Sequence, residues 1–281
     1  MIFPGKISEM RLFSPVCSRN LASYFFEERL IFMQNLVGLV RRCADDYGML
    51  QPGDRVAVGV SGGKDSLTLL VLLAALRKYH PSRFDLHAVT VDMGLAGMDF
   101  TQVEALCHRL EVPYTRVETQ IAPIIFDYRQ EKNPCSMCAK MRRGALNQAL
   151  LELGCNKVAL GHHYDDAVET FFLSLFYEGR LSCFQPVTNL DRTGVIQIRP
   201  MLYLSEKTIA HFAAKERLPV VHNPCPADKN TKRQEVKDLV YELSSRYPDL
   251  KERVFGAMQR LPLPEWGPKG RYKRPRDTGE R

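Results

Sequence analysis

The sequence has no hydrophobic run long enough to cross a membrane. Its longest apolar stretch, residues 67–76, has ten residues and is interrupted by Thr68, whereas a bilayer-spanning helix needs ~20. The first thirty residues lack the continuous apolar core of a secretory signal. Cysteine is sparse, with eight in 281 residues, which excludes a disulfide scaffold. We therefore expect a cytoplasmic protein without a membrane partner, whose cysteines are thiols or metal ligands.

Acidic residues are too few to balance the basic ones, and the two ends of the chain stand apart from its middle. The net charge is +7, and the last fourteen residues hold six basic and two acidic side chains. Residues 261–281 are thus predicted to be a basic tail, either a solvated end or a set of phosphate contacts. Residues 1–32 are treated as an N-terminal extension, read either as a transit peptide or as a start placed too early, with Met33 opening the protein. The main domain is expected over residues 33–260.

Short apolar strands alternate with helices in the middle of the chain. Strands are predicted over 55–60, 86–91, 114–117 and 158–160, and helices over 35–47, 65–79, 100–110, 137–153, 165–177, 205–216 and 231–247. With 45% hydrophobic and 25% charged residues, the composition is that of a globular protein and excludes disordered and fibrous classes. The alternation predicts an α/β fold, a parallel sheet with helices on both faces.

A glycine-rich loop follows the first predicted strand. A helix begins within it, so free backbone N–H groups and the helix dipole favour an anion. Two glycines allow close approach, a lysine supplies charge and two serines supply hydroxyls. These residues are Ser61, Gly62, Gly63, Lys64, Asp65 and Ser66. The ordinary P-loop requires Ser or Thr after its lysine; because an aspartate stands there, an NTPase that cleaves between the β and γ phosphates fits poorly.

A second polar segment, residues 161–166, follows the strand predicted at 158–160 and reads Gly-His-His-Tyr-Asp-Asp. It is expected at the same carboxyl edge of the sheet, where α/β folds bind ligands. Asp165 and Asp166 have two interpretations, as caps of the following helix or as ligands of a hard cation such as magnesium. Asp92 ends the second predicted strand.

A Cys-x-x-Cys pair, Cys135 and Cys138, is the third feature. Such a pair can be redox-active, bind zinc or bind an iron–sulfur cluster. No second Cys-x-x-Cys completes a zinc site. Cys225 is a further cysteine in a loop sequence, Asn-Pro-Cys-Pro. Four others are interpreted as buried thiols: Cys43, Cys107, Cys155 and Cys183.

Taken together, these segments resemble the tRNA 2-thiocytidine synthetase family of PP-loop ATP-pyrophosphatases. The resemblance covers about residues 33–245 and includes 61–66, Cys135-x-x-Cys138 with 142–144, 161–166, Arg199-Pro200 and Pro224-Cys225. It implies an adenine-nucleotide α-hydrolase-like fold and three cofactors, namely ATP, Mg2+ and a [4Fe-4S] cluster. The implied nucleotide-binding residues are 61–66, Asp92, Gly161 and His162; the implied catalytic residues are Lys64, Asp65, Arg142, Asp165 and Asp166. The implied cluster ligands are Cys135, Cys138 and Cys225, and the implied magnesium ligands are Asp165 and Asp166.

The same resemblance suggests a mechanism and partners. A base oxygen of a bound tRNA attacks the α-phosphate of ATP and releases pyrophosphate; sulfur held on the cluster then replaces AMP. Lys64 would assist departure of pyrophosphate and Arg142 would steady phosphate charge. A sulfur donor is expected, either a cysteine desulfurase or free sulfide, and a homodimer is plausible. Six basic residues besides the tail are candidates for RNA contact: Lys140, Arg143, Arg180, Lys229, Lys232 and Arg233.

Two alternatives stay open from the sequence. One is a PP-loop enzyme that thiolates uridine in tRNA, or a ligase of lysidine type. Ligases of that type lack the cysteine triad, and the uridine thiolases carry extra zinc-binding cysteine pairs that this sequence lacks. The other is a non-enzymatic nucleotide-binding protein, which would explain the glycine loop but not the cysteines or the aspartate pair.

Overall fold

One six-stranded sheet organises the molecule, in the order β3-β2-β1-β4-β6-β5. The computed structural model describes residues 16–129, 134–190, 193–226 and 232–260, with side chains from residue 30 onward. The strands are β1 (Arg55–Gly59), β2 (Asp85–Asp92), β3 (Tyr114–Glu118), β4 (Lys157–Ala159), β5 (Val187–Leu190) and β6 (Val195–Ile198). Neighbours are parallel except β5, which runs antiparallel to β6 at the edge. The predicted α/β class is confirmed, with one antiparallel edge strand added.

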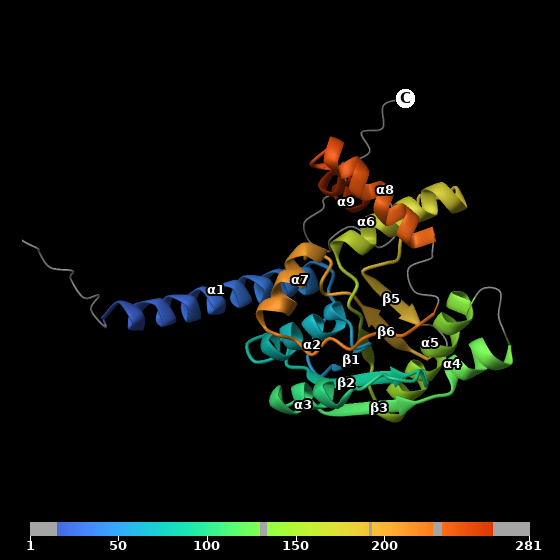
Figure 1. The fold of residues 1–281 in the computed structure, drawn as a ribbon, viewed down its shortest axis with the longest axis horizontal. Helices are drawn as coiled ribbons and strands as arrows, with labels where there is room; N and C mark the ends of the chain where they lie inside the picture. Colours follow the sequence, from blue (N-terminus) through green and yellow to red (C-terminus); the bar gives the residue numbers. More distant parts are fainter. Residues whose placement is uncertain (1–15, 130–133, 191–192, 227–231, 261–281) are drawn as a thin grey trace, which may run out of the picture.

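Helices cover both faces of this sheet (Figure 1). They are α1 (Val16–Asp46), α2 (Lys64–Leu76), α3 (Thr101–Arg109), α4 (Ile121–Pro123), α5 (Pro134–Glu152), α6 (Tyr164–Leu173), α7 (Glu206–Lys215), α8 (Lys232–Arg246) and α9 (Leu250–Arg260). Two π-helical turns, η1 (Ile124–Tyr128) and η2 (Ser174–Glu178), extend α4 and α6. Because side chains alternate along β1, Val56 and Val58 face the cluster that contains α1, α2 and α7, while Ala57 faces α5.

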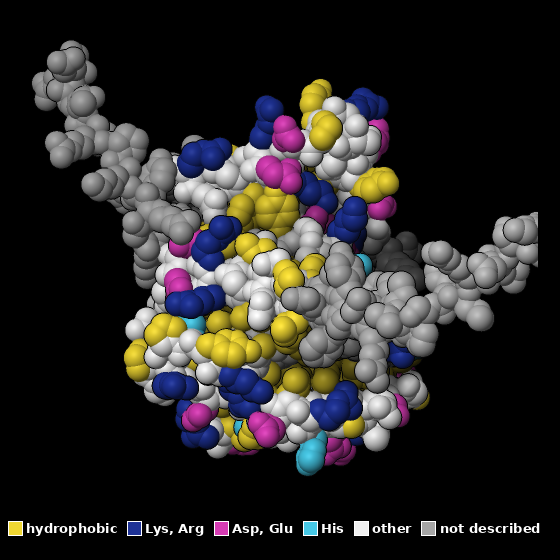
Figure 2. Space-filling model, turned by 90° about the vertical axis from the view of Figure 1, so that its left-hand side faces the viewer, with side chains coloured by type: hydrophobic (Ala, Val, Ile, Leu, Met, Phe, Trp, Pro, Cys, Tyr) yellow, Lys and Arg dark blue, Asp and Glu magenta, His cyan; other side chains and the backbone are white. Residues whose placement is uncertain are grey.

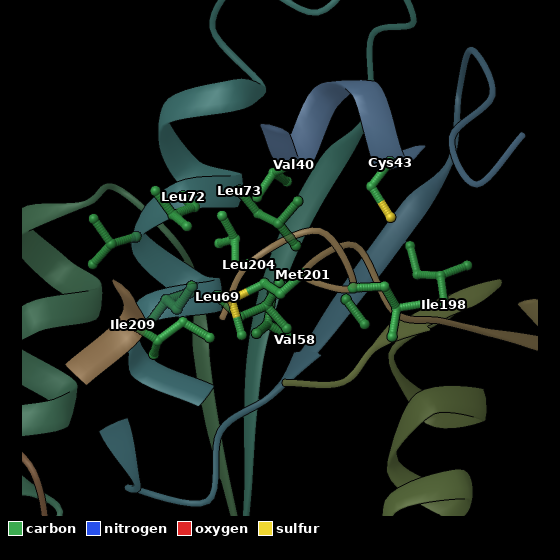
Figure 3. Close-up of a cluster of buried hydrophobic side chains, with 14 of the residues drawn as sticks. Val40, Cys43, Val58, Leu69, Leu72, Leu73, Ile198, Met201, Leu204 and Ile209 are labelled. Carbon is green, nitrogen blue, oxygen red and sulfur yellow. The ribbon is translucent and has the colours of Figure 1, made fainter. Parts of the chain in front are cut away.

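Helix α2 is the centre of the larger core. Ten of its thirteen residues are buried, because the sheet encloses it on one side and α1 and α7 on the others. Figure 3 shows Leu69, Leu72 and Leu73 of α2 beside Val40 of α1 and Ile209 of α7. A helix packed this tightly fixes its own first turn in space, and that turn carries the glycine loop.

Helix α1 begins far upstream of the predicted start at residue 35. It begins at Val16 and continues to Asp46 without interruption. The extra length follows from the absence of Gly and Pro between residues 16 and 34, so the packed C-terminal half of α1 can propagate the helix outward. The backbone of its first half projects away from the body (Figure 1). Phe32, the last residue of the expected N-terminal extension, contacts His211 and Phe212 of α7.

Five elements were absent from the sequence-based expectation, namely α4, η1, β5, β6 and α9. Strands β5 and β6 are four residues long, too short to show an alternating pattern. Helix α9 was not predicted, although its residues 255 and 258 are buried. The α5 helix begins at Pro134 rather than at residue 137, which suits proline at a first helical position.

Two further findings bear on the ends of the chain and on membranes. None of the helices over the described ranges has both the length and the apolar character to cross a membrane. The predicted basic tail, residues 261–281, lies outside the residues that the structure describes, as does Lys229.

Candidate active site at the carboxyl edge of the sheet

The glycine loop lies between β1 and α2, at the carboxyl end of β1. Its two serines close it: Ser66 Oγ accepts from the Ser61 N–H at 3.1 Å and donates to the Gly63 carbonyl at 3.0 Å. Gly63 is the N-cap of α2 and has no side chain to cap it, so the first N–H groups of the helix remain available to an anion. The strand, glycine loop and helix start predicted from the sequence are present.

Gly62 is a position where the backbone requires glycine. Its φ is +86°, and a Cβ there would lie 2.9 Å from Val221 Cβ. The Gly62 carbonyl accepts a hydrogen bond from the Val221 N–H at 2.9 Å. The loop is therefore fastened to the segment that leads to Cys225, four residues further along.

Lys64 lies between two carboxylates. Its Nζ is 3.1 Å from Asp65 Oδ1 and 3.2 Å from Glu206 Oε1. Glu206 also pairs with Lys237 Nζ at 2.8 Å. Burial would lower the pKa of Lys64, but the charges and hydrogen bonds of Asp65 and Glu206 raise it. Burial would likewise raise the pKa of Glu206, yet Lys237 and Lys64 bring it down to about 2, so the three groups are charged together.

The second motif packs directly on the first. A Cβ at Gly161 would come within 3.1 Å of the Asp65 carbonyl carbon and of the Ser66 nitrogen. His163 Nε2 lies 3.8 Å from Asp65 Oδ1 and 3.4 Å from Asp166 Oδ2. The predicted meeting of the two segments at one edge is thereby confirmed.

Asp165 and Asp166 have different surroundings. Asp166 caps its own helix, since its Oδ2 accepts from the His163 N–H at 3.0 Å, and its Oδ1 lies 3.5 Å from Arg233 Nη1. Asp165 is buried and caps α7 instead: its Oδ2 accepts from the Glu206 N–H at 2.6 Å, and its Oδ1 pairs with Lys251 Nζ. Only Asp166 therefore caps the following helix as predicted, and it is the more accessible of the two.

Asp92 ends β2 at the same edge, as predicted. It is buried, and its Oδ2 accepts from Arg116 Nε at 3.0 Å and from Arg116 Nη2. Its Oδ1 accepts from the Gly94 N–H at 2.9 Å. The carboxylate is therefore held in a fixed position beside the loop that follows β2.

His162 is paired with Arg199, the residue that follows β6. Arg199 Nε donates to His162 Nδ1 at 3.2 Å, and its guanidinium also donates to the Gln185 carbonyl and to Thr188 Oγ1. Both rest on the Phe184 ring. Burial first, and the Arg199 charge second, lower the pKa of His162 to about 4. The imidazole is consequently neutral, with its proton on Nε2.

Glu169 lies one helical turn beyond Asp166 on α6 and is buried. Burial raises its pKa to about 7, against the opposing charge of Lys237. The carboxyl group therefore titrates near neutral pH inside the cluster of charges between α6 and α8.

The charges of Cys135 and Cys225, two cysteines of the predicted cluster site, both act on the thiol of the third, Cys138. Cys135 and Cys138 are in the first turn of α5, and Cys138 Sγ lies 3.4 Å from Met93 Sδ, next to Asp92. Burial raises the pKa of Cys138; the Arg142 guanidinium opposes this, and the charges of Cys225 and Cys135 add to it. Arg142 thus lies beside a thiol.

The side chains present differ in how they suit the two implied metal cofactors. Over the described ranges, no group of three or more His, Cys, Asp or Glu side chains is gathered as a metal site. Magnesium fits nonetheless, because Asp65 Oδ1 is shielded from water and, beside its ion pair with Lys64, accepts no hydrogen bond, and Mg2+ is usually held by one or two carboxylates plus phosphate oxygens. An iron–sulfur cluster fits the cysteines by the chemistry of their side chains, since all three are soft thiol donors and the charges of Cys135 and Cys225 both act on Cys138.

The candidate RNA-contacting residues come from different elements: Lys140 and Arg143 from α5, Arg180 from the segment after η2, and Lys232 and Arg233 from α8. Lys232 Nζ lies 4.4 Å from the centre of the Tyr177 ring, and Arg233 Nη2 donates to Thr170 Oγ1 at 2.9 Å. On the face from which α1 projects, Figure 2 shows Lys and Arg side chains separated by hydrophobic and acidic ones. Positive charge on that face is therefore dispersed.

Several residues of this site escaped the sequence-based reasoning. Glu206, Lys237 and Lys251 gave no signal, because each lies on a helix after the sheet and reaches the site only through the fold. Arg199 was noted as part of an Arg-Pro pair, yet its contact with His162 was not foreseen.

Fold and loop together define a PP-loop nucleotide-binding protein, and comparisons agree with this class. Residues 35–243 match the model of a family described as PP-loop domain. A tRNA-cytidine(32) 2-sulfurtransferase of Syntrophotalea carbinolica is 39% identical over 83% of this chain and 90% of its own. One from Anaeromyxobacter dehalogenans is 41% identical over 76% of this chain and 74% of its own. The chain belongs to the PP-loop family and, within it, to the tRNA-cytidine(32) 2-sulfurtransferases.

A solved structure is also similar. It is the U34-tRNA thiolase NcsA from Methanococcus maripaludis with its [4Fe-4S] cluster, with a TM-score of 0.66 and 27% identity. The similarity covers 80% of this chain and 77% of that one.

Proposed function

We propose that the chain is an ATP-dependent tRNA sulfurtransferase that replaces an oxygen of a cytidine with sulfur. The observation that carries this proposal is that the phosphate-binding loop and the cysteines meet at one edge of the sheet. The Val221 N–H donates to the Gly62 carbonyl, four residues before Cys225, and Cys138 contacts Met93, the neighbour of Asp92. A nucleotide and a sulfur-handling site would thus serve a single substrate base.

The first step is adenylation of the base. ATP phosphates lie over residues 61–66, where the helix dipole and Lys64 stabilise negative charge. The cytidine oxygen attacks the α-phosphorus, its bond to phosphorus forms, and pyrophosphate leaves with the electron pair of the α–β bridge. The second step forms a carbon–sulfur bond at the same ring carbon and releases AMP.

Of the two magnesium ligands expected from the sequence, Asp165 and Asp166, only Asp166 would hold the ion. Asp165 already accepts from the Glu206 N–H and pairs with Lys251, whereas Asp166 is more accessible and lies near Asp65 through His163. We propose Asp65 and Asp166 as the protein ligands, with phosphate oxygens completing the shell.

Cys135, Cys138 and Cys225 would hold a [4Fe-4S] cluster. When bound, such a cluster would supply one iron that no cysteine of the chain ligates, and an outside sulfur could attach to that iron. Arg142, beside Cys138, favours the thiolate over the thiol. The sulfur would come from a cysteine desulfurase or from free sulfide, in the cytoplasm. A homodimer is part of the same proposal.

tRNA binding would draw on Lys140, Arg143, Arg180, Lys232 and Arg233, with the tail of residues 261–281. If these side chains contact phosphates, tRNA affinity falls steeply with added salt, in proportion to the number of contacts. A binding constant that is flat between 50 and 200 mM salt would remove them from the interface.

Thiolation of uridine is a second candidate, favoured by the similarity to NcsA. Both candidates predict ATP consumption and a cluster, but they differ in the modified nucleoside. The test is incubation of the anaerobically purified protein with ATP, Mg2+, sulfide and unmodified tRNA, followed by mass spectrometry of nucleosides. 2-Thiocytidine supports the proposal and 2-thiouridine supports the second candidate. The absence of both nucleosides overturns both candidates.

A further inference from the structure

Glu206 places a carboxylate beside Lys64 of the glycine loop. A negative charge next to a phosphate-binding loop repels the phosphates, unless it serves the cations around it. Glu206 touches two of them, with Lys64 Nζ at 3.2 Å and Lys237 Nζ at 2.8 Å. The first belongs to the loop and the second to α8.

The position of Glu206 is itself fixed. Ser205 caps α7 by accepting from the Thr208 N–H, and the Glu206 N–H donates to Asp165 Oδ2 at 2.6 Å. Asp165 is in turn held by Lys251 of α9. The backbone that carries Glu206 is thus tied to the second motif and to the C-terminal helices, so its carboxylate reaches Lys64 from a rigid support.

We infer that Glu206 is the positioning residue of Lys64: it holds the ammonium over the loop for the departing pyrophosphate, and Lys237 offsets its charge. This inference rests on the proposed function and names a residue that the motifs do not contain. With Asp65 on one side and Glu206 on the other, Lys64 has two ion-pair partners that fix its direction. Without Glu206, the lysine would be held only by its own neighbour in the chain.

The inference predicts an unusual pattern for Glu206→Gln, which keeps the shape and removes the charge. ATP binding should be unchanged or up to threefold tighter, because one negative charge has left the phosphate site. The rate of pyrophosphate release with tRNA should fall tenfold or more, because Lys64 has lost its orientation. Damage to the site as a whole would instead weaken ATP binding.

Lys237→Gln is the matched control, because it breaks the other half of the same ion-pair group. If Glu206 serves Lys64, Lys237→Gln weakens ATP binding about threefold by leaving the Glu206 charge less compensated, whereas Glu206→Gln does not weaken it. If Glu206 only anchors α8, the two variants behave alike.

The experiment is isothermal titration with ATP on the full chain, together with pyrophosphate release in the presence of tRNA. An ATP affinity that is kept or raised in Glu206→Gln and lowered in Lys237→Gln, together with a tenfold or greater loss of rate in Glu206→Gln, supports the inference; Glu206→Asp should regain part of the rate. Equal shifts, a tenfold loss of ATP affinity in Glu206→Gln, or an unchanged rate overturn it. Should the wild type release no pyrophosphate, the proposed function fails, and the affinities alone decide the role of Glu206.

Discussion

Gly161 and Asp65 approach so closely that a Cβ at residue 161 would lie 3.1 Å from the Asp65 carbonyl carbon. This contact brings the end of β4 against the first turn of α2. The two polar motifs, almost a hundred residues apart in the chain, thereby form one continuous surface.

Gly161→Ala should weaken ATP binding about tenfold or more, because the added methyl group displaces the backbone that carries the phosphate N–H groups. Titration calorimetry measures this directly. Gly38→Ala is a suitable control: it lies on α1 with nothing within 4 Å of its Cβ, so ATP affinity should not change. Equal affinities for the wild type and Gly161→Ala would contradict the contact.

Cys135→Ala should abolish thiolation and lower the bound iron, yet leave ATP binding within twofold of the wild type. The reason is that the cysteine is exposed at the start of α5 and is not one of the loop residues 61–66. Iron and acid-labile sulfide analysis of anaerobically purified protein provides the readout. Cys107→Ala, a buried thiol on α3, should keep its iron. Full iron in Cys135→Ala would exclude this residue as a ligand.

His162 should make stability depend on pH. Burial and Arg199 lower its pKa to about 4, so the unfolded chain takes up a proton below pH ~6.5 that the folded chain refuses. The contribution to stability is therefore complete above pH ~6.5 and falls as the pH drops towards about 4, by at most ~3 kcal/mol.

Urea unfolding between pH 7.5 and 4.5 tests this, with His162→Gln compared with the wild type at each pH. Glu169, whose pKa is raised to about 7, acts in the opposite direction over the same range. The difference between variant and wild type is therefore the quantity to follow. Parallel curves would show that His162 is not the titrating group.

Lys157→Met should destabilise the fold by about 3–5 kcal/mol, because it leaves Asp54 buried without its cation. The two side chains are both nearly inaccessible, and their charged atoms are 2.6 Å apart. They lie at the amino ends of β4 and β1, away from the loop edge, so the ATP affinity of the folded protein should not change. Denaturant melts and ATP titration check both parts; a loss below ~1 kcal/mol would contradict the prediction.

Sequence reasoning succeeded where the signal is local. The strand, glycine loop and helix around residues 55–76 are contiguous, and the segment 161–166 follows its own strand in the same way. It failed where partners are distant: Lys64 and Glu206 are 142 positions apart, and Lys251 and Asp165 are 86 apart. No residue pattern encodes such pairs. Strands β5 and β6 were missed because four residues show too little periodicity.

The bond between Gly62 and Val221 has a consequence for genetics. A Cβ at residue 62 would lie 2.9 Å from the Val221 Cβ. A substitution of Gly62 that is meant to abolish nucleotide binding would therefore also displace the segment that leads to Cys225. Nucleotide binding and the placement of Cys225 therefore cannot be altered separately by a substitution at residue 62. Alleles that remove one and spare the other should be sought at Lys64 and at Cys135, whose side chains do not share this support.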